Sequence, residues 1–425
     1  MLPVAVIATF HHDGTLAYWI YLHFQTRLRI TWRSGTRSRA RNAGLVRHTF
    51  HVSGVTLAIS PGWRSRRRLW RLLACLACAA VALAVLAIDA DRFLYGAAPV
   101  LRLGGSPAAL AVSPGGRMIY LADSPGSIIP VSAATGKPGK AILVSGGTTG
   151  DLAYSKLTVT PDGRTLFALL IGLGAGGVPQ IVRVDLRTGK ETGQFQVPGG
   201  AYDFAPSSDD ATLYVVSGDN TLIAVDAVTG RPERRIPVPA NLLAGEGAMV
   251  LSPDGGTLYV TTTDQDAQAG AVTPVSLRTG APGRAVSVGW EPESLAITPD
   301  GRTLYAAVDG MMGPSGQVAP NRVVAIDTVT DRVRASLQWQ APPLYLAMAP
   351  NGATLWVASI GGDRGSTADD TVTPVSVGND RPGTSFRTAG WLNATDDGPS
   401  GMAMSPGGRT LYVTVSTGLE TFGLP

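Results

Sequence analysis

The sequence predicts an all-β fold, a seven-bladed β-propeller of four-stranded antiparallel, WD40-like blades, from three observations. First, a Pro-containing turn followed by a strand with one aromatic residue occurs seven times within residues 98–425. Second, these aromatic residues are 47, 47, 45, 46, 51 and 56 positions apart, which is the length of one propeller blade. Third, the repeat consists of strand and turn signals throughout. The aromatic residues are Tyr120, Phe167, Tyr214, Tyr259, Tyr305, Trp356 and Tyr412.

One repeat illustrates how a blade is built. The strands expected for it, from the innermost outward, are residues 294–298, 303–308, 322–327 and 334–338. Pro299 and Gly301 form the turn between the first two, because Pro presets φ and Gly can take a positive φ. Apolar residues occupy both faces of these strands, which indicates a blade covered by neighbours on both sides. The third strands of three repeats contain Pro130, Pro274 and Pro374, so we expect bulges or frayed pairing there.

The two ends of the repeat region predict how the ring closes. Residues 100–103 have the character of an outermost strand with no inner strands before them, and residues 419–422 that of a third strand with no outer strand after it. The first strand is therefore expected to complete the seventh blade and remove the exposed sheet edges.

The fixed position of the aromatic residue favours packing between blades over a sugar-stacking platform. The Asp of the Pro-Asp-Gly turns is interpreted as a turn former, because Gly115, Asn351 and Gly407 replace it in other repeats.

The first hundred residues differ from the rest in charge. Residues 1–97 carry a net charge of +10, whereas residues 98–425 carry −6. Residues 1–68 are predicted to be a basic, disordered segment, with an alternative translation start near residue 55. Residues 69–89 are predicted to form one apolar helix. Its uncharged run Leu72–Ile88 follows five Arg residues, so the positive-inside rule leaves the N-terminus in the cytoplasm and the propeller outside. A cleaved signal peptide, with secretion of the propeller, is the alternative.

Composition excludes several classes of function for the propeller. All five His and both Cys precede residue 98. The repeats therefore lack a His general base, a thiolate nucleophile and any His or Cys metal ligand. A net negative charge gives no support for nucleic-acid binding.

Two segments, residues 258–262 (LYVTT) and 411–415 (LYVTV), each follow a Ser-Pro-x-Gly turn and resemble the YVTN family of seven-bladed propellers. That family includes surface-layer, YncE-like and lactonase-like proteins, and the resemblance covers residues 98–425. It implies an extracytoplasmic binding or scaffold protein. The lactonase-like members use His in their central cleft, and no His is present here to take that role.

The loops predict where binding occurs. Turns between first and second strands and between third and fourth strands are uniform, whereas the loops of the opposite face vary widely, which favours that loop-rich face for binding. At the start of the innermost strands, a set of polar residues is expected to ring the mouth of the central channel. These candidates are Lys156, Asp203, Glu246, Glu291, Glu293, Tyr345, Asp396 and Asp397.

The sequence leaves three functions open. A membrane-tethered, extracytoplasmic binding or scaffold module is favoured. A lactonase-like or other hydrolase would use carboxylates and a divalent cation in the channel, and no catalytic residue is assigned for it. A purely structural component of the cell envelope is the third alternative. Apart from that divalent cation, no cofactor is expected, and the acidic rim has the alternative interpretation of solvated loop charge.

Overall fold

The computed structural model divides the chain into two compact units, Met1–Leu86 and Ala87–Pro425. It describes the strands of the first unit and residues 100–424 of the second. Within the second unit the description omits residues 103–106, 124–125, 146–151, 173–178, 218, 220, 238–247, 265–268, 311–318, 362–369, 389–391, 393, 396–397 and 400.

The first unit contains five strands in the segment for which composition predicts disorder. β1 (Ala5–Phe10), β2 (Leu16–Tyr21) and β3 (Arg27–Trp32) form an antiparallel sheet, and β4 (His48–Val52) pairs with β5 (Val55–Ile59). The predicted apolar helix at residues 69–89 lies outside the described residues. Among the residues that are described, no helix is long and apolar enough to cross a membrane.

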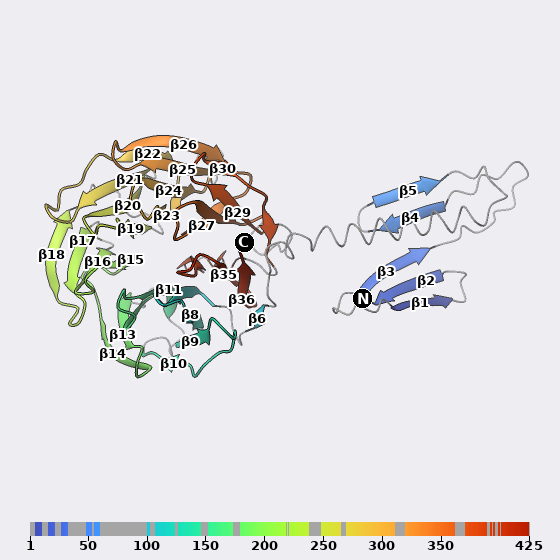
Figure 1. Cartoon of the computed structure of the whole chain (residues 1–425), viewed down its shortest axis with the longest axis horizontal. Coiled ribbons are helices and arrows are strands. Elements are labelled where there is room, and N and C mark those ends of the chain that lie inside the picture. Colours follow the sequence, from blue (N-terminus) through green and yellow to red (C-terminus); the bar gives the residue numbers. More distant parts are fainter. Residues whose placement is uncertain are drawn as a thin grey trace, which may run out of the picture. The chain divides into compact units, whose positions relative to one another are not determined.

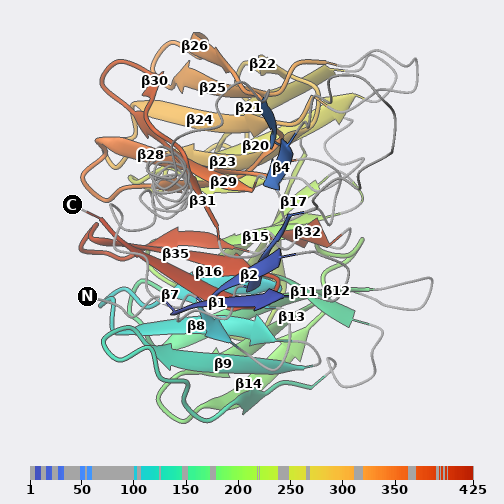
Figure 2. The same cartoon turned by 90° about the vertical axis from the view of Figure 1, so that its right-hand side faces the viewer.

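The second unit is a ring of seven antiparallel blades, as predicted (Figure 1). The innermost strands lie toward the centre of the ring, and in the side view the strands of one blade follow one another outward from β23 to β26 (Figure 2). The innermost strands are β7 (Ala109–Val112), β11 (Leu152–Val159), β15 (Asp203–Pro206), β19 (Met249–Leu251), β23 (Pro292–Ile297), β27 (Pro343–Met348) and β34 (Met402–Met404).

The second and third strands have at least six residues in every blade. The second strands are β8 (Met118–Asp123), β12 (Thr165–Gly172), β16 (Thr212–Ser217), β20 (Thr257–Asp264), β24 (Thr303–Val308), β28 (Thr354–Ser359) and β35 (Thr410–Val415). The third strands are β9 (Ser127–Ser132), β13 (Gln180–Asp185), β17 (Thr221–Asp226), β21 (Ala269–Ser276), β25 (Arg322–Asp327), β29 (Thr371–Ser376) and β36 (Gly418–Gly423).

The outermost strands vary most in length. They are β10 (Ile142–Leu143), β14 (Lys190–Phe195), β18 (Pro232–Pro237), β22 (Val286–Gly289), β26 (Arg332–Gln338), β30 (Arg381–Pro382) with β31 (Phe386–Arg387), and β6 (Leu101–Arg102). β6 pairs with β36 through Leu101↔Leu419 and Arg102↔Gly418. The predicted closure of the seventh blade by the first strand of the propeller is therefore confirmed.

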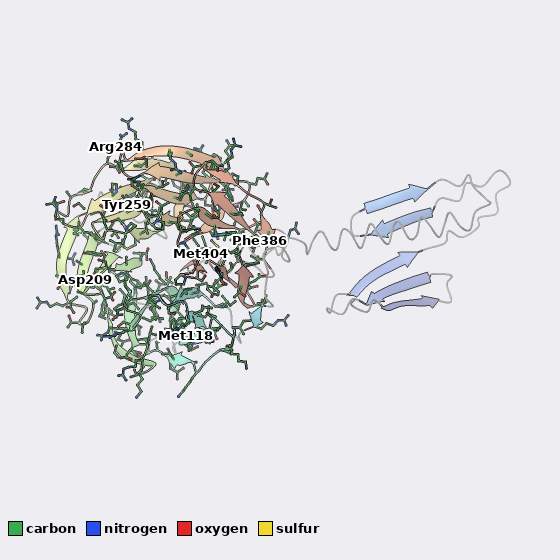
Figure 3. All side chains as sticks on the ribbon, in the orientation of Figure 1. Met118, Asp209, Tyr259, Arg284, Phe386 and Met404 are labelled. Carbon is green, nitrogen blue, oxygen red and sulfur yellow. The ribbon has the colours of Figure 1, made fainter. Side chains whose placement is uncertain are left out.

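The core consists of seven hydrophobic clusters among the described residues, one at each junction between consecutive blades. The repeated aromatic residue contributes to each of them. Phe167 and Tyr305, for example, are 1% and 0% exposed and pack against the next blade. Inter-blade packing, rather than a sugar platform, is therefore confirmed for these residues. Figure 3 shows Met404 of β34 toward the centre of the ring and Arg284 at its rim.

The third-strand prolines disturb pairing on one side only. Pro130 lies opposite Tyr120 in an unbroken ladder with β8, while its carbonyl accepts a hydrogen bond from Gly139 of the outer segment at 2.7 Å. Because the N–H and C=O of one strand residue point to the same neighbour, the missing donor of Pro130 also faces outward. The outer strand is accordingly short there, and Pro274 and Pro374 repeat the arrangement with Gly283 and Gly383. The predicted fraying is thus confirmed.

Three other blades carry a β-bulge at the same third-strand position. The register with the outer strand shifts after Arg183, Ala224 and Ala325, which align with the three prolines. In these blades the outer strand continues through the bulge, so one position of the repeat interrupts the ladder by either of two means.

The turns between third and fourth strands offer a test of this packing. Gly230 and Gly136 occupy equivalent turns with φ of 69° and 65°. A Cβ on Gly230 would lie 2.2 Å from Phe195 Cγ, whereas one on Gly136 would meet nothing within 4 Å. We expect Gly136→Ala to cost about 1–2 kcal/mol from the left-handed backbone alone. Gly230→Ala should cost a further 1–3 kcal/mol, roughly, from overpacking. Urea unfolding of both variants measures the difference, and equal losses would contradict the packing argument.

Candidate functional site

Three of the innermost strands are bulged at the end that bears the long loops. The register shifts at Ser155 in β11, at Glu293 in β23 and at Leu344 in β27. Each bulge contains or immediately precedes a residue predicted to ring the channel mouth, namely Lys156, Glu293 or Tyr345. Bulges re-aim side chains and are frequent at barrel rims and beside functional sites. The backbone therefore departs from regular pairing where the sequence predicts binding.

The structure brings two predicted site residues together in an ion pair. Lys156 of β11 and Asp203 of β15 belong to neighbouring innermost strands, and Lys156 Nζ donates to Asp203 Oδ1 at 2.6 Å. The ammonium also lies 5.7 Å from the centre of the Phe204 ring, within range of a cation–π interaction. The Lys156 side chain keeps 31% of its surface exposed, against 10% for Asp203.

Asp203 is braced from three directions. Besides Lys156, its Oδ1 accepts the backbone N–H of Phe204 at 2.7 Å, and its Oδ2 accepts that of Met249 in β19 at 2.9 Å. The carboxylate thus links the innermost strands of three successive blades. Burial raises the pKa of Asp203, while Lys156 and the two backbone donors oppose that rise.

The remaining described candidates lie in the next blades. Glu291, in the connection between β22 and β23, has a φ of 23°, which is uncommon for a residue other than glycine. Its carbonyl accepts the N–H of the buried Asp309 at 3.0 Å. Glu293 is partly exposed. Tyr345 is 9% exposed and packs in the hydrophobic cluster between the sixth and seventh blades, so its ring serves that junction.

Three predicted site residues, Glu246, Asp396 and Asp397, lie outside the described residues, as do most residues of the long loops. The connection from the sixth to the seventh blade nevertheless contains a hairpin that the sequence did not indicate, formed by β32 (Ala394–Thr395) and β33 (Gly398–Pro399). β33 lies against β11 of the second blade.

Sequence reasoning also missed the groups that organise this region. In the sequence, nothing distinguishes Phe204, Met249 and Ser155 from other strand residues, so neither the bulge at Ser155 nor the amide contact of Met249 could be predicted. The buried Asp370, which is not among the predicted site residues, accepts the N–H of Gly361 at 3.0 Å and that of Leu392 at 2.7 Å. In the part of the chain that the structure describes, no three His, Cys, Asp or Glu side chains are grouped to hold a metal ion.

Comparison with known proteins relates the chain to propellers. The family model described as Phytase-like, esterase-like activity of phytase, matches residues 171–355. A search of curated proteins finds no match. Hydrazine synthase of Kuenenia stuttgartiensis superposes with a TM-score of 0.59 at 20% identity, over 76% of this chain and 97% of that one. The Cps50 (Swd1) β-propeller domain of Myceliophteria thermophila superposes with a TM-score of 0.59 at 12% identity, over 77% and 99%.

At these identities the structural likeness shows the fold alone, a seven-bladed propeller. The family model covers less than half of the chain, and none of the matches confirms the resemblance to the YVTN family.

The raised pKa of Asp203 predicts a pH dependence with a definite sign. The pKa of an Asp carboxyl group in an unfolded chain is about 3.9. When the folded-state pKa is higher, the group stabilises the folded protein fully at pH values below the unfolded pKa, and this stabilisation is lost as pH rises through the folded-state pKa. We therefore expect the free energy of unfolding of the wild type, relative to Asp203→Asn, to fall as pH rises above about 4. Urea titrations at several pH values measure it.

Asp219 provides the control of opposite sign. Hydrogen bonds from Ser217 and Thr221 lower the pKa of Asp219 to about 2. Its contribution is present above the unfolded value and is lost as pH falls toward about 2. The wild type should therefore gain on Asp219→Asn as pH rises over that range. A rise for Asp203 as well would contradict the dominance of burial at that residue.

Proposed function

We propose that this chain is an extracytoplasmic binding or scaffold module that acts through the loop-rich end of its propeller. The observation that carries the proposal is the set of bulged innermost strands there, together with the ion pair of Lys156 and Asp203. A propeller is a rigid ring, and rigid scaffolds commonly carry binding residues on the loops and strand ends of one face. The opposite face offers near-identical turns, which provide little with which to discriminate a ligand.

In this proposal residues 72–88 anchor the protein in a membrane, with the N-terminus in the cytoplasm. The Arg residues before this run and Asp89 and Asp91 after it support that orientation. Secretion after cleavage of a signal peptide would put the propeller on the same side of the membrane.

A thermal-shift screen of the full chain tests the binding function. Divalent cations, sugars, lactones and cell-wall fragments are the ligands, and a binder stabilises the folded state by about 2.7 kcal/mol when free ligand is about 100 times Kd. We expect the stabilisation to weaken in Glu293→Gln and to persist in Asp300→Asn, whose Asp lies in a turn of the opposite face. If the ligand-induced stabilisation is lost in Asp300→Asn and kept in Glu293→Gln, the ligand binds the opposite face and the proposal is contradicted. No shift with any ligand would contradict small-molecule binding.

A hydrolase is the second candidate, favoured by the family model over residues 171–355, whose description names an esterase-like activity. Because residues 98–425 lack His and Cys, such an enzyme would depend on carboxylates and a divalent cation. Hydrolysis of p-nitrophenyl acetate, with and without added Mg²⁺ or Ca²⁺, tests it. The hypothesis predicts a loss of about 10²–10⁴-fold in Asp203→Asn or Glu293→Gln and no change in Asp300→Asn. Turnover no faster than in buffer would rule this candidate out for that ester.

A further inference from the structure

The chain uses lysine very sparingly. Of its 35 basic residues only four are Lys, and the other 31 are Arg. Lys137 and Lys140 are exposed residues between a third strand and its outer strand, and Lys190 is the exposed first residue of the outer strand β14. Lys156 differs from them because it lies on an innermost strand, and it is the one basic residue on the seven innermost strands. In a protein whose basic residues are nearly all Arg, the basic residue on an innermost strand is therefore a Lys.

An ion pair at the outer edge of the ring, between Arg334 and Asp380, has a structural role and serves as a comparison. Arg334 of β26 binds Asp380 of the next blade through two hydrogen bonds, from Nε at 3.0 Å and from Nη2 at 2.6 Å. The same guanidinium donates to Thr303 Oγ1 at 3.0 Å and to Tyr305 Oη at 3.1 Å. All of its nitrogen atoms are engaged. Arginine suits this task because its planar fork offers several fixed donors.

The ion pair of Lys156 and Asp203 differs in how many donors of the basic group are engaged. Lys156 Nζ carries three N–H donors, and in the described part of the chain it has one hydrogen-bond partner, Asp203 Oδ1. The Asp203 carboxylate is shared with two backbone N–H groups, which disperse its negative charge. The ammonium is therefore held in place by Asp203 and Phe204 and keeps donor capacity on the exposed part of its side chain.

From this contrast we infer that Lys156 is the binding point for the oxyanion of a small ligand, a carboxylate or a phosphate, at the loop-rich end of the channel. The inference deepens the binding function proposed above and rests on it. A compact ammonium with unused donors binds such an oxygen by a charge-assisted hydrogen bond. Its partly buried position strengthens that bond relative to one at the exposed Lys137, Lys140 or Lys190.

Acetylation of the full chain by an N-hydroxysuccinimide ester tests the inference, because the four lysines can each be followed by mass spectrometry. Inorganic phosphate and acetate are the probes, compared with chloride at equal ionic strength. At a probe concentration about ten times Kd, we expect acetylation of Lys156 to slow about tenfold, since only unoccupied protein reacts. The rates at Lys137, Lys140 and Lys190 should not change. Equal effects at all four lysines, or none at Lys156, would overturn the inference.

Variants provide a second, independent measurement. The double variant Lys156→Met with Asp203→Asn removes both charges and leaves no unpaired buried carboxylate. Thermal stabilisation of the full chain by phosphate or acetate should disappear in this variant and persist in the surface control Lys140→Met. Persistence in the double variant would overturn the inference.

The two proposals fail in different ways. If neither oxyanion stabilises the wild type but a sugar, a cation or a lactone does, the binding function stands and the assignment to Lys156 falls. If no ligand of any class has an effect, the small-molecule form of the binding function falls with it.

Discussion

The hydrophobic contact between each blade and the next is the interaction on which the rest of the structure depends. A single four-stranded blade has two apolar faces and cannot bury either alone. The aromatic residue of each second strand fills this junction, and burial of a side chain such as Phe167 stabilises the fold by about 1.5–3 kcal/mol. Because every blade needs two neighbours, the ring has to close. The short pairing of β6 with β36 completes the last blade.

This packing limits where functional side chains can be placed. Successive side chains of a strand are buried alternately in the two junctions of its blade. Tyr345 and Leu346, for example, pack in different hydrophobic clusters. Side chains available to a ligand must come from strand ends, from loops or from bulges. Lys156 follows such a bulge, and Asp203 is the first residue of its strand. The positions of Lys156 and Asp203 are thus a consequence of how the blades pack into a ring.

Charged pairs serve two purposes in the same ring. At the rim, Arg334 and Asp380 join adjacent blades with every guanidinium nitrogen engaged, and Tyr305 completes the contact. Near the axis, Asp203 links three blades and holds an ammonium that is only partly used. The first arrangement joins adjacent blades at the outer edge of the ring, and the second is the one that we propose as the binding point for a ligand.

The sequence by itself determined the fold, because a repeated turn, an aromatic residue and two-sided apolar strands are local features that each blade restates. It also predicted the closing strand, the third-strand prolines that interrupt pairing, and the position of Lys156 and Asp203 on innermost strands. Only the tertiary structure decided that these two residues form one ion pair, that Met249 braces it and that Tyr345 is used for packing. The two contacts of Asp203 join residues 47 and 46 positions apart, across different blades, and Lys156 follows a bulge that shifts its side chain. Strand periodicity carries no signal for such a shift, since an extra residue in one strand is defined only by its partner.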